Sequence, residues 1–285
     1  MLNKILYADS GAENARDLLK YLLELPSLKN TELSILRVVS PTTREQETKA
    51  ISDAETKISE LTSKLGISSE RVEPLVKEGE PKTTVINIAK ETNADLIIMG
   101  SRGLGKLQSF LSNSVSQYVF QLTDRSMLLV KDDIYVKRIR RIMIALDKSP
   151  AAQYALNVAL SMFQGYKDAE IYLARVNPDL NPGLEISQED IDNNPILSVA
   201  ADKVKSRGLS CKCILKGGRP AQQLCKIAED HNIDFMILGS PERRPSVAKN
   251  LPDLERLLGS SLSDYIRIKA ECPVLLARQE EARSS

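Results

Sequence analysis

A glycine-rich stretch after an apolar run is the first feature of this sequence that could do chemistry. It reads Gly100-Ser-Arg-Gly-Leu-Gly-Lys106, and a helical pattern begins near Asn113. A glycine-rich loop that leads into a helix N-terminus lets backbone N–H groups approach phosphate oxygens without obstruction by Cβ atoms. The hydroxyls of Ser114 and Ser116 and the charge of Arg102 add donors. The sequence therefore predicts a phosphate-binding site in this stretch.

Three well-known loop motifs fit the stretch less well. Leu107 stands where a P-loop has the Ser or Thr that binds magnesium. A dinucleotide fingerprint needs three spaced glycines after the first strand, whereas here that segment ends in Ala8-Asp9-Ser10. The chain also lacks the Gly-x-Ser-x-Gly elbow of a hydrolase. The alternative interpretation is that these residues bind no ligand: the glycines form a flexible turn, and Asp9 caps the following helix.

The chain is duplicated, which shows that the stretch belongs to a repeated unit. Gly79 and Gly100 recur as Gly218 and Gly239, in each case 139 residues later, within similar surroundings. A repeat of this length indicates a duplicated domain and not a solenoid unit. The charged segment 132–141 separates the copies, so we expect domains at 1–135 and 136–285.

Apolar runs alternate with helical patterns within each copy. In the first copy we expect strands at 3–8, 32–39, 70–76, 95–99 and 126–130, and helices near 12–25, 43–65, 81–92 and 112–122. In the second copy we expect strands near 141–146, 169–176, 210–215, 234–238 and 273–277. Short, continuous apolar strands between helices predict an α/β fold, with a doubly wound parallel five-stranded sheet in each domain. The apolar residues of 51–65 cover too few heptads for a coiled coil and are expected to pack on the sheet.

The glycine-rich stretch resembles a motif of a known protein family. Gly100-x2-Gly103-x9-Asn113-Ser114 resembles the motif Gly-x2-Gly-x9-Gly-(Ser/Thr) of the universal stress protein family. Asp9 at the end of the first strand and Val38 at the end of the second also match, as do the repeats, so the resemblance covers nearly the whole chain. Asn113 departs from the motif, because the family has glycine there.

The resemblance implies a strand order of 3-2-1-4-5, domains paired through their fifth strands, and an ATP site in the first domain with Mg²⁺ bridging the phosphates. By the same resemblance, Asp9 and Val38 would contact adenine and ribose, Met99 would flank the base, and the glycine loop would follow the phosphates. The expected nucleotide-binding residues are Ala8, Asp9, Ser10, Val38, Met99, Gly100, Arg102, Gly103, Asn113, Ser114, Val115 and Ser116.

The second domain departs further from the motif, and we expect a degenerate site there. Its loop 241–258 contains three prolines and no glycine, so it cannot wrap a triphosphate in the same manner. The residue opposite Asn113 is Gly259 or Ser260, depending on the alignment. The corresponding positions are Leu146, Asp147, Val176, Gly239, Gly259, Ser260 and Ser261.

Composition limits the partners and the compartment. Thirty-nine basic and 38 acidic residues leave a net charge of +1, which indicates neither nucleic-acid nor membrane binding. We expect a cytoplasmic protein, because neither a signal peptide nor an apolar run of membrane length is seen. The cysteines are expected to be reduced and largely buried, because Cys211 and Cys213 lie far from the single histidine and lack zinc-ligand spacing. No metal site is expected.

The expected function is that of a nucleotide-dependent sensor or adaptor in the stress response, and not that of an enzyme. The glycine loop has no general base beside it, no acidic pair for two metals and no nucleophile–histidine arrangement. Two alternatives stay open, namely a slow ATPase or nucleotide transferase, and an interaction protein that binds no nucleotide. A further homodimer and an unidentified protein partner also stay open.

Overall fold

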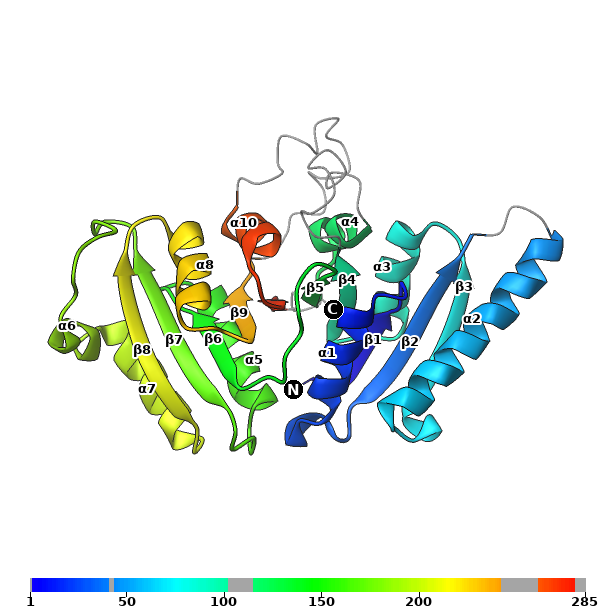
Figure 1. Ribbon diagram of the computed structural model, residues 1–285, viewed down its shortest axis with the longest axis horizontal. Coiled ribbons are helices and arrows are strands. Elements are labelled where there is room, and N and C mark those ends of the chain that lie inside the picture. The colour runs from blue at the N-terminus through cyan, green and yellow to red at the C-terminus, as the bar shows by residue number, and fades with distance from the viewer. Residues whose placement is uncertain (1, 41–43, 102–114, 242–260, 280–285) are drawn as a thin grey trace, which may run out of the picture.

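A single ten-stranded sheet runs through the molecule in the computed structural model (Figure 1), which describes residues 2–40, 44–101, 115–241 and 261–279. The strands are β1 (Lys4–Ala8), β2 (Glu32–Val39), β3 (Val72–Glu78), β4 (Leu96–Ser101), β5 (Ser126–Lys131), β6 (Arg141–Ala145), β7 (Glu170–Asn177), β8 (Ser210–Gly217), β9 (Phe235–Gly239) and β10 (Val274–Ala277). The helices are α1 (Glu13–Leu23), α2 (Arg44–Leu65), α3 (Pro81–Glu91), α4 (Val115–Leu122), α5 (Pro150–Met162), α6 (Gln188–Asp192), α7 (Pro195–Ser206), α8 (Pro220–Asp230) and α10 (Leu262–Lys269), with short 3₁₀ helices η1 (Pro26–Leu28) and η2 (Ser69–Arg71).

The topology confirms the predicted fold. The strand order is β3-β2-β1-β4-β5-β10-β9-β6-β7-β8, so each half has the order 3-2-1-4-5 with parallel neighbours. The halves meet where β10 pairs antiparallel with β5. These are the fifth strands of the two copies, and their pairing joins the two predicted five-stranded sheets into one.

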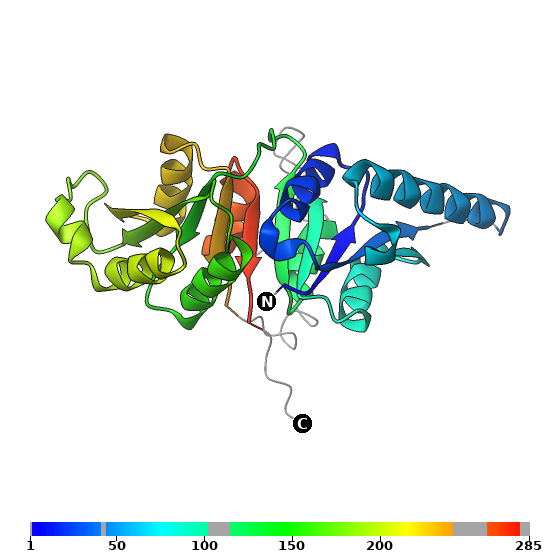
Figure 2. The same ribbon diagram turned by 90° about the horizontal axis from the view of Figure 1, so that it is seen from below.

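Helices cover both faces of the sheet, as a doubly wound fold requires. One apolar cluster packs α1, α2, α5 and α7 on the first face, and a second cluster packs α3, α4, α8 and α10 on the other. Side chains alternate between these clusters along β1, because Ile5 and Tyr7 belong to the first and Leu6 and Ala8 to the second. Each cluster continues from one half into the other. Figure 2 shows helices on both sides of the strands in each half.

Helix α2 covers the sheet, which settles the coiled-coil alternative for its apolar stripe. Ala54, Ile58 and Leu61 are at most 3% exposed, and the helix lies along β2 and β3.

The turn before the third helix of each half explains the repeated Gly-x-Pro. Gly79 and Gly218 have φ values of +138° and +109°, which a residue with a Cβ rarely adopts. Two residues later, Pro81 and Pro220 begin α3 and α8. Proline suits the first helical position, because its φ is already helical and its missing N–H would have no partner there.

The last helix of each half is capped by a cation from the other half. The Nη1 atom of Arg278 donates to the carbonyls of Phe120 at 2.9 Å and Thr123 at 2.7 Å, at the end of α4. The Nζ atom of Lys131 donates to the carbonyl of Ile268 near the end of α10, at 3.3 Å. Cations at helix C-termini satisfy carbonyls that lack intrahelical partners. The two contacts therefore fasten the halves to each other beside the β5–β10 pair.

The connector between the halves is held to the protein despite its many charges. Ile134, Val136 and Ile139 are each at most 8% exposed and belong to the first apolar cluster. The amide nitrogen of Asn14 donates to the carbonyls of Lys131, Asp132 and Ile134.

Candidate functional site

The carboxyl ends of β1, β2 and β4 meet at one edge of the first half. Ala8 lies beside Leu36 of β2 and Met99 of β4, and the N–H of Asp9 donates to the carbonyl of Leu36 at 2.9 Å. Helix α1, which follows β1, packs on one face of the sheet, and α4, which follows β4, packs on the other. The edge between β1 and β4 is therefore the switch point where doubly wound folds bind ligands.

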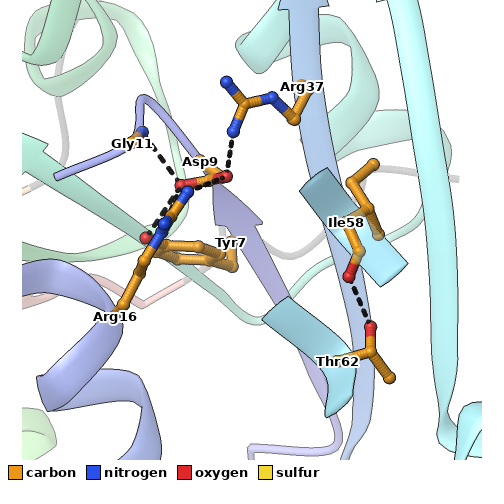
Figure 3. A network of polar contacts seen from close by, with 7 residues as sticks. All are labelled: Tyr7, Asp9, Gly11, Arg16, Arg37, Ile58 and Thr62. Atoms are coloured by element: carbon orange, nitrogen blue, oxygen red, sulfur yellow. Dashed lines mark hydrogen bonds and ion pairs between the residues drawn. The ribbon is translucent and has the colours of Figure 1, made fainter. Parts of the chain in front are cut away.

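Asp9 is the centre of a buried polar network at this edge (Figure 3). Its carboxylate is completely buried, whereas the side chains of Arg16 and Arg37 are 25% and 17% exposed. Arg16 donates from Nε to Oδ1 at 3.2 Å and from Nη2 to Oδ2 at 3.0 Å, while Nη1 of Arg37 donates to Oδ2. Tyr7 Oη at 3.3 Å and the N–H of Gly11 at 2.9 Å donate to Oδ1. One carboxylate thus serves two guanidinium groups, and the three ionised side chains sum to a charge of +1.

The local backbone explains why the network can form. Gly11 has a φ of +90°, which lets its N–H turn back onto the Asp9 side chain. Arg16 lies in the first turn of α1, seven residues after Asp9. Arg37 is next to Asp9 when the parallel register of β1 and β2 is continued by one residue. Each donor is therefore carried by a different element around the acceptor.

The network fixes the ionisation of Asp9. Burial alone would raise the pKa of this carboxyl, but the hydrogen bonds from Arg16 and Gly11 and the charges of both arginines outweigh burial and lower the pKa. Burial and the neighbouring Asp9 charge raise the pKa of Tyr7, so its hydroxyl stays a donor. Asp9 is thus held as an anion that two cations share.

The structure brings other predicted residues to the same edge, on both sides of the sheet. Ala8, Val38 and Met99 lie in or against the second apolar cluster, on the face opposite Tyr7. A Cβ on Gly100 would lie 3.0 Å from Ala12 Cβ and 3.5 Å from Ser10 Oγ. The glycine therefore permits close packing of α1 on β4. A glycine at this position in the sequence fits this packing role as well as a phosphate-binding role.

The phosphate end of the predicted site is described only in part. Helix α4 begins at Val115, and Ser116 in its first turn is 3% exposed. Four of the predicted residues, Arg102, Gly103, Asn113 and Ser114, lie outside the described residues.

The second half does not repeat the network. Asp147 is exposed, and its Oδ1 accepts from Ser149 N at 2.8 Å and Ser149 Oγ at 2.5 Å. Ser149 is the N-cap of α5, so Asp147 supports a helix start here. Arg175 recurs at the position of Arg37, and its Nε is buried without a hydrogen bond to any described residue. Tyr154 stands at the position of Arg16.

The other predicted positions of the second half serve packing and capping. Leu146 and Val176 are buried, at 4% and 9% exposed. A Cβ on Gly239 would lie 2.3 Å from the backbone of Ala151, so α5 packs closely against the end of β9. Ser261 is the N-cap of α10, while Gly259 and Ser260 lie outside the described residues.

The segment after β7 covers the carboxyl end of the neighbouring strand. A Cβ on Gly217 would lie 2.3 Å from the carbonyl oxygen of Asn181, and one on Gly218 would lie 3.0 Å from Pro182 Cβ. In the first half, Ser40 to Thr43 span the whole connection from β2 to α2, whereas the second half uses Pro178 to Ser187. The second edge is therefore filled by its own chain where β7 and β8 end.

Sequence reasoning missed Arg16 and Arg37 as members of the site. One signal was available, because parallel strands that start at 4 and 32 place residue 37 beside residue 9. Arg16 offered no comparable signal, since its direction depends on the position of α1.

The described residues fit an anionic ligand better than a bound metal ion. Among them, no three His, Cys, Asp or Glu side chains gather where a metal ion could be held. Cys272 is buried, and Cys211, Cys213 and Cys225 are half-buried. The excess positive charge beside Asp9 and the N-terminus of α4 both favour phosphate groups. The first edge therefore suits an anionic ligand.

Within the described part of the chain, no helix is both long and apolar enough to cross a bilayer.

Comparisons with known proteins match the two halves separately and together. The model of the universal stress protein family matches residues 1–131 and, a second time, residues 138–278. A universal stress protein of Synechocystis is 30% identical over 138 residues, which cover 46% of this chain and 86% of that protein. One of Methanocaldococcus jannaschii is 25% identical over 155 residues, covering 46% of this chain and 96% of that protein. The crystal structure of a universal stress protein from Archaeoglobus fulgidus shares the fold over 98% of this chain and 99% of that one, with a TM-score of 0.73 and 21% identity.

Proposed function

The chain belongs to the universal stress protein family as a tandem member, and we propose that its first domain, residues 1–135, binds ATP and acts as a nucleotide-dependent sensor or adaptor. The second domain, residues 136–285, would then serve as its fixed partner within one sheet. The ligand would lie along the carboxyl edge from the Asp9 network to the N-terminus of α4, with Mg²⁺ bridging its phosphates.

The difference between the two carboxyl edges is the observation that carries this proposal. The first edge combines a positively charged network with the family's glycine-loop motif in sequence. The second lacks the network, has Asn181 and Pro182 against its β8 end, and has Asp147 turned to a helix cap. Positive charge with accessible donors favours phosphates, whereas a filled edge disfavours any ligand.

An alternative function keeps the nucleotide but adds slow hydrolysis. The excess positive charge beside Asp9 would stabilise phosphate charge in a transition state as well as in a bound ligand. We favour a binding role, because Asp9, the carboxylate of this network, is fully engaged by donors and is a poor general base with its lowered pKa.

The test is to identify what the purified protein carries and whether it turns ATP over. The full chain is purified, denatured and analysed for released adenine nucleotide, and the nucleotide-free protein is titrated with ATP. Released nucleotide or saturable ATP binding supports the proposal. If no nucleotide is released and ATP does not bind, the proposal is refuted and the protein is an interaction protein that binds no nucleotide. Steady ADP release above a buffer control would establish the ATPase.

A further inference from the structure

We propose that Arg37 determines the specificity of the first site by contacting a phosphate on the ribose of the ligand, and that Asp9 positions Arg37 for this contact. The preferred ligand class is then an adenine nucleotide that carries a phosphate on the ribose 2′ or 3′ oxygen in addition to its 5′ phosphate. The inference rests on the proposed nucleotide site, because it assigns the β1–β2 end of that site.

The first step is that Asp9 has no capacity left for a ligand. A carboxylate offers about four lone-pair positions. Five donor contacts already reach this one, from Tyr7, Gly11, Arg37 and two atoms of Arg16. A ribose hydroxyl could bind Asp9 only by displacing one of these donors, and removing a guanidinium from a buried carboxylate is costly.

The second step is that Arg37 does have donors to offer. A guanidinium carries five N–H donors in a planar fork. The hydrogen bond recorded for Arg37 within the described residues uses Nη1, toward Asp9. Figure 3 shows the other terminal nitrogen of Arg37 pointing away from the carboxylate. The side chain is 17% exposed, so this end of the fork is shielded enough for a strong contact and open enough to reach.

The third step is the charge that the ligand must complement. An acidic side chain at the ribose end of a nucleotide site recognises free hydroxyls, whereas an arginine there accommodates a phosphate on the ribose. Both kinds of residue are present here, but the acid is shared by two arginines and the sum is positive. The donors left over are guanidinium N–H groups, which form charge-assisted bonds with phosphate oxygens.

The experiment compares two ligands that differ by one phosphate. The full chain, the Arg37→Gln variant and the Arg37→Lys variant are titrated calorimetrically with AMP and with adenosine 3′,5′-bisphosphate. In the parent, the 3′-phosphate should tighten binding by about tenfold or more, the equivalent of about 1.4 kcal/mol. Arg37→Gln should weaken binding of the bisphosphate much more than binding of AMP, and so remove most of this gain. Arg37→Lys, which keeps the charge but loses the fork, should retain part of the gain.

The second domain supplies the matched control. Arg175→Gln changes the corresponding arginine of the second half and should leave the affinities for AMP and for the bisphosphate as they are in the parent. Thermal unfolding of each variant shows whether it is folded. Equal affinity of the parent for the two ligands, or a gain that survives Arg37→Gln, would overturn the inference while the nucleotide site stands. Failure of AMP, the bisphosphate and ATP alike to bind the parent would refute the proposed function and this inference with it.

Discussion

Replacing Asp9 by asparagine should destabilise the protein strongly at neutral pH. The substitution keeps the size of the side chain but removes the charge that Arg16 and Arg37 share. Removing one partner from a buried ion pair leaves uncompensated charge and costs roughly 3–5 kcal/mol. Both arginines keep some contact with solvent, so we expect the lower end of this range, about 3 kcal/mol at pH 7.

The loss should depend on pH in a defined direction. The pKa of Asp9 is lowered in the folded protein, so its ionised form stabilises the fold. This contribution is complete above the unfolded-state pKa of about 3.9 and is lost as the pH falls through the lower folded-state pKa. The difference in stability between parent and variant should therefore be constant from pH 7 to about pH 5 and shrink below about pH 4.

Urea unfolding at a series of pH values measures this difference. Asp147→Asn is the matched control, because Asp147 is exposed and accepts only from Ser149 among the described residues. An amide oxygen can replace the carboxylate there, so we expect a change within about 0.5 kcal/mol. A cost of less than about 1 kcal/mol for Asp9→Asn, or a cost that persists unchanged at pH 3, would show that the ion pairs do not hold this edge together.

Four further predictions concern the nucleotide site and its packing. ATP should bind with a stoichiometry near one per chain, and a calorimetric titration that fits two equivalent sites would contradict the asymmetry of the halves. Gly103→Val should abolish ATP binding with the fold intact by circular dichroism, since its side chain would fill the space where backbone meets phosphate; unchanged affinity would place the phosphates elsewhere. Asn113→Gly should keep or tighten ATP binding, and a loss of affinity for ATP but not for ADP would show that the amide contacts the terminal phosphate. Gly239→Ala should cost about 1–3 kcal/mol in urea unfolding, because its Cβ would overlap the backbone of Ala151 at 2.3 Å. Gly100→Ala should cost less, because the nearest atom to its Cβ would be Ala12 Cβ at 3.0 Å, and equal costs would refute the packing role of Gly239.

The fold could be predicted from the sequence because its signals are local and repeated. Continuous apolar runs gave strands close to those observed, for example 32–39 for β2 and 126–130 for β5. The turn at Gly79 and Pro81 recurs at Gly218 and Pro220 for the same steric reason in both halves. What could not be predicted is the reciprocal capping by Arg278 and Lys131, because it joins residues that are more than 130 positions apart.

The candidate site could be located from the sequence but not resolved into roles. The carboxyl ends of β1, β2 and β4 are where the alternation of elements placed them, and Asp9 lies at this edge. Whether its carboxylate faces a ligand or a protein cation depends on the direction of Arg16 and Arg37, which a sequence pattern does not report. Gly100 has the same ambiguity, because close helix packing and close phosphate approach both exclude a Cβ.

The two halves show why the recurrence of a residue is weak evidence for its role. Asp9 and Asp147 occupy the same place in the repeat, and Arg37 and Arg175 follow at the same spacing. In the first half, Arg16 reaches back from α1 and completes a buried network; in the second half, a tyrosine at this position offers no second cation, and the aspartate bonds to Ser149. The residue at this position of the first helix is thus one difference between an acid that organises two cations and an acid that supports a helix start. Exchanging that residue is the direct way to ask how much of the asymmetry it causes.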